Sequence, residues 1–583
     1  MPQIRTIPTN PPTASLVTFS IKIEGQNIPR TISVKNLVVS RQVNKIPKLS
    51  LSILDGNASQ SNFDMSNQDH FVPGKKIEIS AGYNSQEELL FAGIIIKHSI
   101  KISTTETALM VEAADVSFKM SLNPKRKVFN DITDGQLIEE IAGLYAIETD
   151  IEATSVNHKE LMQYFATDWD YIQTRAEAAG KLCFCENGKL VVKAPALDAQ
   201  PLLDLVYGAT IKELNAEIDT RFQYSGVQGI SWDSSTQDLI NTEATAPVIN
   251  EQGNISSDEL SAVAQKEPVI LMHGGNVTEA EMQSRIDLQL LKSRLARIRG
   301  TVSISGYAGV MPGHMIKLNG VGDRFAGNSF VSGIRHDISS GLWETVIQFG
   351  INHKWFAEEN DIQPLPAAGF TPSVKGLQIG IVTNLENDPD GEDRIKVKVP
   401  VVDNNGEGLW CKMAMPDAGD NRGFYFRPEI GDEVVVGFLS EDPGYGIVLG
   451  CLHSSAKPAP VRASNNNHEK GIITRSQMKW IWNDEKKTLT IETPAGNTVL
   501  ISDDEKEIRL KDEHGNSISM NSDGITIESS KNIMIKAVSD MTIEAGTNME
   551  INAGASLKAS GSAQAEMSSS GITAIKGSMV MIN

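Results

Sequence analysis

A strict period of eight residues runs through the C-terminal part of the sequence and limits the folds open to the chain. From Gly524 it reads GITIESSK, NIMIKAVS, DMTIEAGT, NMEINAGA, SLKASGSA, QAEMSSSG and ITAIKGSM, followed by VMIN. Positions two and four of most octads are apolar, position three is mostly polar, and the others are small or polar. Residues two apart on a strand point to one face. Each octad therefore predicts a short strand and a corner, stacked on its neighbours as in a solenoid.

The apolar pairs of the octads are the predicted core of this needle-like segment. They are Ile525 and Ile527, Ile533 and Ile535, Met541 and Ile543, and Met549 and Ile551. Eight residues are too few to close a coil, so two arrangements satisfy the repeat. Either three successive octads of one chain form a triangular turn, or three chains wind around one axis and each gives one strand per level. Both bury an apolar column inside a polar shell, and the period alone does not choose between them.

The rest of the sequence predicts a mainly β chain with a few helices. Short alternating runs between Ser15 and Ser121 indicate a β domain, and units of about ten residues follow Lys486. The segment 241–276, rich in Asn, Ser, Glu and Gln, is expected to be a long loop or excursion between elements. The spacing of apolar residues predicts three helices, at 134–145, 167–179 and 278–299.

The third of these helices has the best-defined start. Thr278 and Glu281 form a capping box, in which the hydroxyl and the carboxylate satisfy backbone N–H groups of the first turn. Its expected apolar stripe consists of Met282, Ile286, Leu291, Leu295 and Ile298. Basic residues near its negative dipole end are expected to form a solvated face rather than a nucleic-acid contact; they are Lys292, Arg294, Arg297 and Arg299.

Residues 374–452 predict a compact unit of five short strands around polar turns, which suits an OB-type barrel. The acidic turn Asp388–Asp393 lacks the ligand spacing of an EF-hand, so it is interpreted as a solvated hairpin rather than a calcium site.

Charge and cysteine content exclude several classes of function. The chain has 583 residues and a formal charge of −20, which argues against a general role in coating nucleic acid or anionic lipid. The cysteines are too dispersed for a disulfide framework or a zinc site and are expected to be reduced thiols; they are Cys183, Cys185, Cys411 and Cys451. The stretch Met1–Pro8 has no apolar segment typical of a secretory signal, so synthesis in the cytoplasm is expected.

Several motifs resemble those of the VgrG family. They are GIVTN at 380–384, DPDG at 388–391, RIKVKVP at 394–400, FRPEIGDEVVVGF at 426–438, GIVLG at 446–450 and IKGSMVMIN at 575–583. VgrG is the spike of type VI secretion systems. The domain order is also similar to the spike of extracellular contractile injection systems and to the hub and cell-puncturing proteins of phage tails fused into one chain. The resemblance covers almost the whole sequence.

The resemblance implies a domain plan and a set of partners. The plan is a hub-like base with two barrel-like subdomains and helices at 1–365, an OB domain at 373–456, a linker at 457–487 and an octad-repeat β-helix at 488–583. A homotrimer is implied, which favours the three-chain arrangement. Its base is expected to meet a hexameric tube protein and baseplate components, and its needle to puncture a target envelope when ejected. A PAAR-type tip protein, which also carries effectors, is expected to dock on Val580, Met581, Ile582 and Asn583.

No enzyme signature accompanies this plan. The sequence has no nucleophile elbow, zinc-protease motif or nucleotide-binding loop, so no catalytic, cofactor-binding or metal-ligating residues and no nucleic-acid partner are expected. One alternative, a cell-wall or polysaccharide hydrolase on a β-solenoid, needs paired carboxylates on one face. The glutamates of the octads fall at different positions: Glu528 and Glu544 at position five, Glu550 and Glu566 at position three. A non-injecting phage tail component or adhesin is the other alternative.

Overall fold

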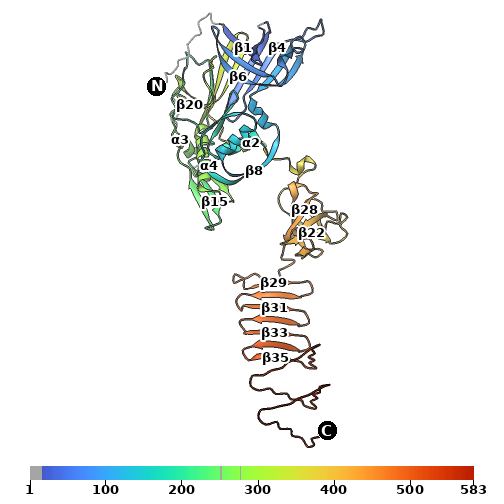
Figure 1. Ribbon diagram of the computed structural model, residues 1–583. Coiled ribbons are helices and arrows are strands. Elements are labelled where there is room, and N and C mark those ends of the chain that lie inside the picture. Colours follow the sequence, from blue (N-terminus) through green and yellow to red (C-terminus); the bar gives the residue numbers. More distant parts are fainter. Residues whose placement is uncertain are drawn as a thin grey trace. The chain divides into compact units, whose positions relative to one another are not determined.

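Strands form most of the regular structure in the computed structural model, which describes residues 16–29, 31–249, 252–264, 266–275, 277–360 and 362–582 (Figure 1). The mainly β fold expected from the sequence is therefore confirmed. The chain divides into two compact units, mainly on either side of the Ser373–Val374 peptide bond. The stretch Met1–Pro8 and the residue Asn583, both named above, lie outside the described residues.

A sheet of 13 strands organises the first unit. The strands are β1 (Val17–Ile23), β2 (Gln26–Asn27), β3 (Val34–Gln42), β4 (Lys48–Leu54), β5 (Lys76–Tyr83), β6 (Gln86–Ile102), β7 (Thr107–Ala114), β13 (Leu203–Val206), β14 (Glu213–Ile218), β18 (Ile298–Ser305), β19 (Met315–Asn319), β20 (Gly327–Ser339) and β21 (Leu342–Phe349). One core, around Leu51 and Phe91, is formed mainly by β1 to β7 and also includes Ile338 of β20 and Trp343 of β21. A second, around Val302 and Ile347, lies within β13 to β21. Antiparallel pairing of β3 with β20 joins the two barrel-like halves.

A helical subdomain is inserted between the two halves. It consists of β8 (Pro124–Thr133), α1 (Asp134–Gly143), β9 (Glu148–Ile151), β10 (Asn157–Thr167), α2 (Asp168–Ala178), β11 (Leu182–Glu186) and β12 (Lys189–Lys193). Leu137, Ile138 and Ile141 of α1 pack with Ile172 of α2 in a core of its own. The first two predicted helices are confirmed within about two residues at each end, because each begins at a threonine cap that the sequence shows.

The third predicted helix is α4 (Glu279–Leu295), and its capping box between Thr278 and Glu281 is confirmed. It ends at Leu295 rather than Arg299, because β18 begins at Ile298. The expected solvated basic face is wrong for Lys292 and Arg297, whose relative exposure is 3% each. Lys292 is paired with Glu177 and donates to the carbonyl of Lys354. Arg297 donates to the carbonyls of Gln252 and Ile255.

The segment 241–276 is not a simple loop. Among its described residues it contains the end of β16 (Asp238–Glu243), the helix α3 (Ser257–Ala264) and β17 (Val269–His273). Strands β16 and β17 flank β15 (Val227–Asp233), and β17 pairs with β15 in parallel. Such pairing is distant in sequence, so local composition did not reveal it. Helix α5 (Phe356–Glu359) and 3-10 turns at Asp69–Phe71, Val116–Ser121 and Pro366–Gly369 complete the unit.

The second unit begins with a closed five-stranded barrel, as the OB prediction requires. Its strands are β22 (Gln378–Asn384), β23 (Ile395–Lys398), β24 (Leu409–Met413), β27 (Glu433–Phe438) and β28 (Gly446–Cys451), with a small hairpin of β25 (Ala418–Gly419) and β26 (Arg422–Gly423) and a 3-10 turn at Leu439–Glu441. Val382, Val397, Val434 and Val448 fill the barrel. The pKa of Asp388 lies well below its usual range because the Arg394 guanidinium donates hydrogen bonds to it.

Seven antiparallel strands follow the barrel as a meander. They are β29 (Glu469–Ile473), β30 (Lys479–Asn483), β31 (Thr488–Glu492), β32 (Thr498–Ser502), β33 (Glu507–Lys511), β34 (Ser517–Asn521) and β35 (Gly524–Glu528). The segment 457–487, expected to be a linker, instead supplies β29 and β30. Its apolar residues form two short runs, one at Ile472 and one at Trp480, Ile481 and Trp482. These runs give a weaker signal in the sequence than the regular octads.

Candidate assembly face

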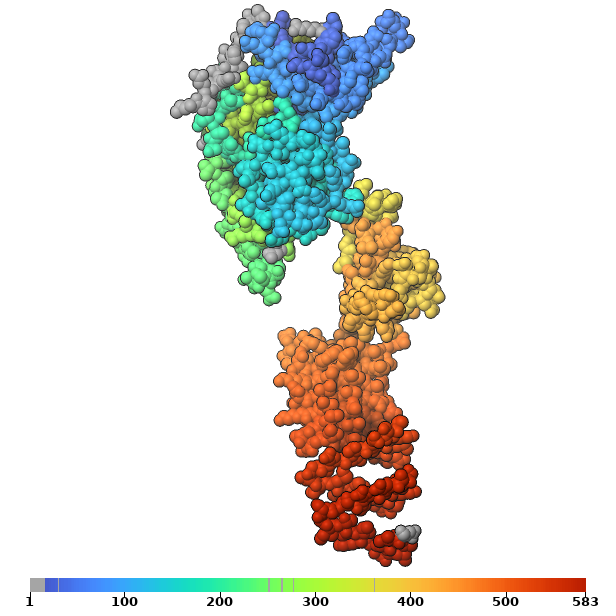
Figure 2. Space-filling view, viewed as in Figure 1, coloured from blue at the N-terminus to red at the C-terminus, as the bar shows by residue number. Residues whose placement is uncertain are grey.

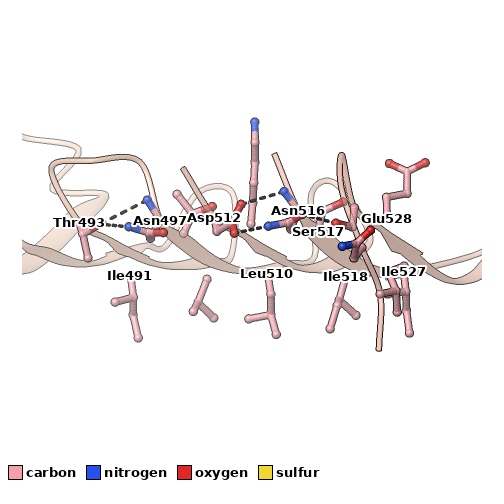
Figure 3. Close-up of a pocket in the computed structure, with 16 residues that line it drawn as sticks. Ile491, Thr493, Asn497, Leu510, Asp512, Asn516, Ser517, Ile518, Ile527 and Glu528 are labelled. Atoms are coloured by element: carbon pink, nitrogen blue, oxygen red, sulfur yellow. Dashed lines mark hydrogen bonds between the residues drawn. The ribbon is translucent and has the colours of Figure 1, made fainter. Parts of the chain in front are cut away.

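One side of the meander carries two columns of apolar residues, here called the apolar face. In the first column, each residue lies directly opposite the next across neighbouring strands: Ile472, Trp480, Ile491, Val499, Leu510, Ile518 and Ile527. The second column runs beside it through Trp482, Leu489, Ile501, Ile508, Met520 and Ile525. Because the two columns are two residues apart along each strand, both point to the same side. Figure 3 shows Ile491, Leu510, Ile518 and Ile527 on that side.

The apolar face is largely uncovered in a single chain. Leu510 is 41% exposed, Ile501 44%, and Ile525, at the C-terminal end of the meander, 70%. Soluble proteins rarely leave a contiguous apolar surface of this extent open to water unless it binds something. The uncovered face therefore indicates that another surface packs against it.

The opposite side of the meander is mostly polar. Its central column passes through Ile481, Thr490, Leu500, Arg509, Ser519 and Thr526. Arg509 forms ion pairs with Glu505 and Glu507 on this side. The sheet is therefore amphipathic, with one side suited to water and the other to a buried position.

Two turns at one edge of the sheet are built in the same way. Asn497 donates its side-chain N–H to the hydroxyl oxygen of Thr493 at 3.0 Å, and Asn516 donates to a carboxylate oxygen of Asp512 at 2.6 Å. The hydrogen bond from Asn516 lowers the pKa of Asp512. Figure 3 shows these polar groups on the side away from the labelled isoleucines.

These turns were not among the features predicted from the sequence. The signal that reveals them is the pair TPAGN and DEHGN, which begin 19 residues apart at Thr493 and Asp512. One turn joins β31 to β32 and the other joins β33 to β34, so a unit of two strands and one turn occurs twice. The meander is therefore a second repeat, distinct from the octads that follow it.

The octads differ in secondary structure from the meander that precedes them. Ile525 and Ile527 belong to β35, but residues 529–582 contain no strand. The other members of the predicted needle core are exposed in the single chain: Ile533, Ile535, Met541, Ile543, Met549 and Ile551. Figure 2 shows this part as a thin chain in separate loops, beyond the compact meander. Successive octads of one chain do not pair with each other, so the triangular single-chain turn is not formed.

The proposed tip-docking residues are also open. Val580 is 48% exposed, and Met581 and Ile582 are 84% and 87% exposed. They follow the octads directly, with no described capping element between them.

The other residues considered for chemistry are the cysteines, most of which are buried. Cys183, Cys185 and Cys411 are buried free thiols, and burial raises the pKa of Cys185 to about 12. Within the described ranges, no group of three or more His, Cys, Asp or Glu side chains is arranged to hold a metal ion. No described helix is long and apolar enough to cross a membrane.

Three protein families match separate segments of the chain. Residues 378–453 match the type VI secretion system/phage-baseplate injector OB domain, and residues 488–583 match the phage baseplate V C-terminal trimerisation domain. Residues 13–340, more than half of the chain, match the Alg8 N-terminal domain. The chain belongs to the Alg8 N-terminal domain family. Its OB and trimerisation domains confirm the resemblance to the VgrG and phage-baseplate spike family.

Individual proteins are similar to parts of this chain. The type VI secretion system spike protein VgrG1b of Pseudomonas aeruginosa is 27% identical over 217 residues, which cover 34% of this chain and 28% of that protein. VgrG3 of Vibrio cholerae is 26% identical over 154 residues, covering 24% and 14%. The chain thus matches less than a third of the length of these relatives. A tail protein of Neisseria meningitidis has a TM-score of 0.43 at 15% identity, covering 58% of this chain and 98% of that one.

The trimerisation match bears directly on the apolar face. It begins at Thr488, the first residue of β31, and includes every octad. The segment is therefore a trimerisation domain. Together with the unpaired octads, this supports the arrangement in which three chains share one axis.

Proposed function

We propose that this chain is the spike of a contractile injection machine and works as a homotrimer. The observation that carries the proposal is the apolar face, which stays uncovered in one chain and leads into octads of which, among the described residues, only the first forms a strand. Two further copies cover the apolar face and give the octads strand partners. The family matches supply the class of machine in which such a trimer is used.

Trimer formation explains how the face is buried. Three amphipathic sheets turn their apolar columns toward a common axis and their polar sides, with Arg509 and its glutamates, toward water. Full burial of each Ile or Leu side chain contributes about 1.5 to 3 kcal/mol. The octads of the three chains then supply one another with strand partners, which a single chain cannot provide.

This construction suits a part that is driven through an envelope. Intertwined strands leave no free lateral edge along the shaft, so it does not pair with foreign strands. Unfolding one chain requires separating all three, which couples stability to assembly. The polar outer surface keeps the shaft soluble before and after ejection to the extracellular space or a target cell.

The two ends of the spike take different partners in this proposal. The base formed by the first unit caps the inner tube, a hexameric protein, and contacts baseplate components. The C-terminal end binds a PAAR-type tip protein through Val580, Met581, Ile582 and Asn583, and effectors travel with it. The exposure of Val580, Met581 and Ile582 supports this docking, because three such ends form an apolar surface that needs a cover.

Two measurements test the proposal. Light scattering of the purified full chain is expected to give about 190 kDa, three times the 63.3 kDa of one chain. Electron microscopy of sheathed particles from the producing cells is expected to show density for the chain at one end of the tube, and deletion of its gene should remove that density. A stable monomer, or intact spikes in the deletion strain, would refute it.

A further inference from the structure

The first unit ends in a short segment that is fastened to two of its helices. This segment, residues 350–360, follows the end of β21 at Phe349, includes α5 and is here called the strap. From the strap the chain continues through residues 362–373 to the second unit, which begins at Val374. The last residues of a domain are usually poorly ordered unless something ties them down. The strap is tied down by buried contacts with α2 and α4, which themselves lie against each other (Figure 1).

The carboxylate of Glu177, near the end of α2, holds the backbone of the strap. One of its oxygens accepts the N–H of Phe356 at 2.8 Å, and the other is paired with the ammonium group of Lys292 on α4. Lys292 also donates to the carbonyl oxygen of Lys354 at 2.7 Å. Glu177 and Lys292 therefore bind each other and also bind the strap on both sides of Trp355.

The ring of Trp355 adds a side-chain contact to these backbone contacts. The Nζ atom of Lys292 lies 4.9 Å from the ring centroid, and the guanidinium carbon of Arg285 lies 5.0 Å from it. A cation over the face of an aromatic ring is attracted to it. Lys292 and Trp355 are only 3% and 8% exposed. The tryptophan is thus held by two cations of the same helix.

Other contacts hold the strap nearer its two ends. The side chain of Ile351 is 8% exposed and belongs to an apolar cluster of the first unit. The ring of His353 stacks on that of Phe222, with the two centroids 3.7 Å apart. The side-chain amide of Asn352 donates to the carboxylate of Glu359, which links the start of the strap to its end. The strap is therefore fastened along most of its length.

The chemistry of the fastening differs from what stability alone requires. A buried ion pair often stabilises a fold no more than apolar residues of similar volume do. Hydrogen bonds, however, depend steeply on distance and angle, so they resist even a small displacement of the groups that form them. The contacts of Glu177 and Lys292 with the strap backbone are of this kind. They suit a segment that must not move when it is pulled.

The strand before the strap is exposed to such pulling. β21 forms hydrogen-bond ladders with β18 on one side and β20 on the other. A force on the end of a strand breaks a ladder one hydrogen bond at a time, so β21 alone would peel away at low force. With the strap in place, the same force first meets the contacts of Glu177 and Lys292, and α2 and α4 share it.

We propose that the strap is a mechanical clamp, which passes force on the connection between the two units into α2 and α4 and keeps β21 in its sheet. The inference rests on the spike function proposed above, because a spike that meets resistance is loaded through residues 362–373. It assigns to Glu177, Lys292 and Trp355 a role that neither assembly of the shaft nor docking of the tip requires.

Pulling on the full chain in an optical trap tests the clamp. In a Cys451→Ser background, Ile102→Cys on β6 and Phe370→Cys in the connection provide two handle sites, which are 65% and 89% exposed. One tagged copy is co-expressed with an excess of the untagged chain, so that each selected assembly carries a single pair of handles. Release of the 11 residues of the strap lengthens the chain by at most about 40 Å. The parent should show no step of this size before the first unit unfolds.

A pair of apolar substitutions is the decisive variant. Glu177→Met with Lys292→Met keeps the volume of both side chains and leaves no charge unpaired, so the urea midpoint should change little. The step of about 40 Å should now appear, at a force several-fold below that of unfolding. Lys127→Met with Glu140→Met, the same exchange in an exposed ion pair of the helical subdomain, should behave as the parent. Trp355→Leu removes the ring without unpairing Glu177, should also show the step, and serves if the methionine pair does not fold.

The outcomes separate the clamp from the spike. An early step in the parent, or no early step in either strap variant, would overturn the clamp and leave the spike function standing. A urea midpoint that falls in proportion to the force would also overturn it, because the pair would then only stabilise the first unit. A monomer in light scattering would overturn the spike, whereas the force curve of a single chain would still report on the clamp.

Discussion

The rings of Trp480 and Trp482 stack on β30 with their centroids 5.0 Å apart. The two residues belong to the two columns of the apolar face, since Trp480 lies opposite Ile491 and Trp482 opposite Leu489. The widest side chains of the columns therefore lie near the barrel end of the shaft, and aliphatic side chains follow. In the proposed trimer, the aromatic pair lies in the part of the shared core nearest the barrel.

The needle core is tested by a pair of adjacent substitutions in one octad. Ile543→Asp places three carboxylates near the trimer axis and removes about 1.5 to 3 kcal/mol of apolar burial per chain, in addition to the cost of burying charge. Thr542→Asp, at octad position three, points outward and should change stability little. Thermal unfolding of the trimer measures both. Equal melting temperatures for the two variants would show that the assignment of faces is wrong.

The buried imidazole of His336 is expected to make stability depend on pH. Burial, with Arg41 as a second cause, lowers the pKa of His336 to about 3 from an ordinary 6.5. The unfolded chain therefore binds a proton that the folded chain does not, and stability falls as the pH drops below 6.5 toward 3. The loss is about 1.4 kcal/mol for each pH unit in that window.

His336→Asn is the matched variant for this effect. The asparagine can still hydrogen-bond to the hydroxyl of Thr345, which lies 2.9 Å from Nδ1 of His336, but it does not titrate. Urea unfolding between pH 4 and 6.5 should show a shallower pH dependence than in the parent. Parallel curves for the two proteins would exclude His336 as the source.

Loss of one partner of the Lys292–Glu177 ion pair is expected to lower the stability of the folded protein. Both side chains are 4% exposed, and Lys292 also donates to the carbonyl of Lys354 at 2.7 Å. Lys292→Met leaves the Glu177 carboxylate buried without its cationic partner, although it still accepts the backbone N–H of Phe356, and is expected to cost about 3 to 5 kcal/mol. Glu177→Gln in the same chain should recover part of the loss.

An exposed ion pair serves as the comparison. Arg335 and Asp337 form a pair in which the arginine side chain is 56% exposed, so Arg335→Met should cost at most about 1 kcal/mol. Guanidinium unfolding followed by tryptophan fluorescence measures all of these variants. If Lys292→Met is as mild as Arg335→Met, the pair does not hold α4 against α2.

Removal of Met579 to Asn583 tests the tip-docking proposal. The truncated chain should still form a trimer, because the meander and the octads up to Ser578 remain. It should no longer co-purify with a PAAR-type protein encoded beside it, whereas a Leu144→Ser variant, altered at an exposed apolar residue of the first unit, should retain capture. Undiminished capture by the truncated trimer would place the tip protein elsewhere.

The elements that the sequence predicted well are those whose signals are local. The Thr278–Glu281 capping box fixes the start of α4, and the turns between its strands define the OB barrel. Elements that depend on distant partners were missed. Strand β17 pairs with β15 across the segment that includes α3, and its five residues carry no signal of their own.

The burial of charged side chains also could not be predicted from the sequence. Lys292 lies near the end of an amphipathic helix, where a basic residue usually faces water. The structure places Glu177 and the carbonyl of Lys354 around it, from helix α2 and from the residues just before α5. The candidate assembly face was predicted only for its octads. Its broader part, on β30 to β34, follows from strand pairing that an octad period does not reveal.

The change from meander to octads gives the assembly of the shaft a direction. Strands β29 to β35 complete their hydrogen-bond ladder within one polypeptide, so this section makes its strand pairs without a second copy. In the proposed trimer, the octads after the first find strand partners only on other copies, so their ordering requires several chains and becomes faster at higher concentration. If the proposed trimer forms, three prefolded sheets are expected to meet first and act as a nucleus. The octads then close like a zipper toward the C-terminus, and the last residues to be ordered are those proposed to receive the tip.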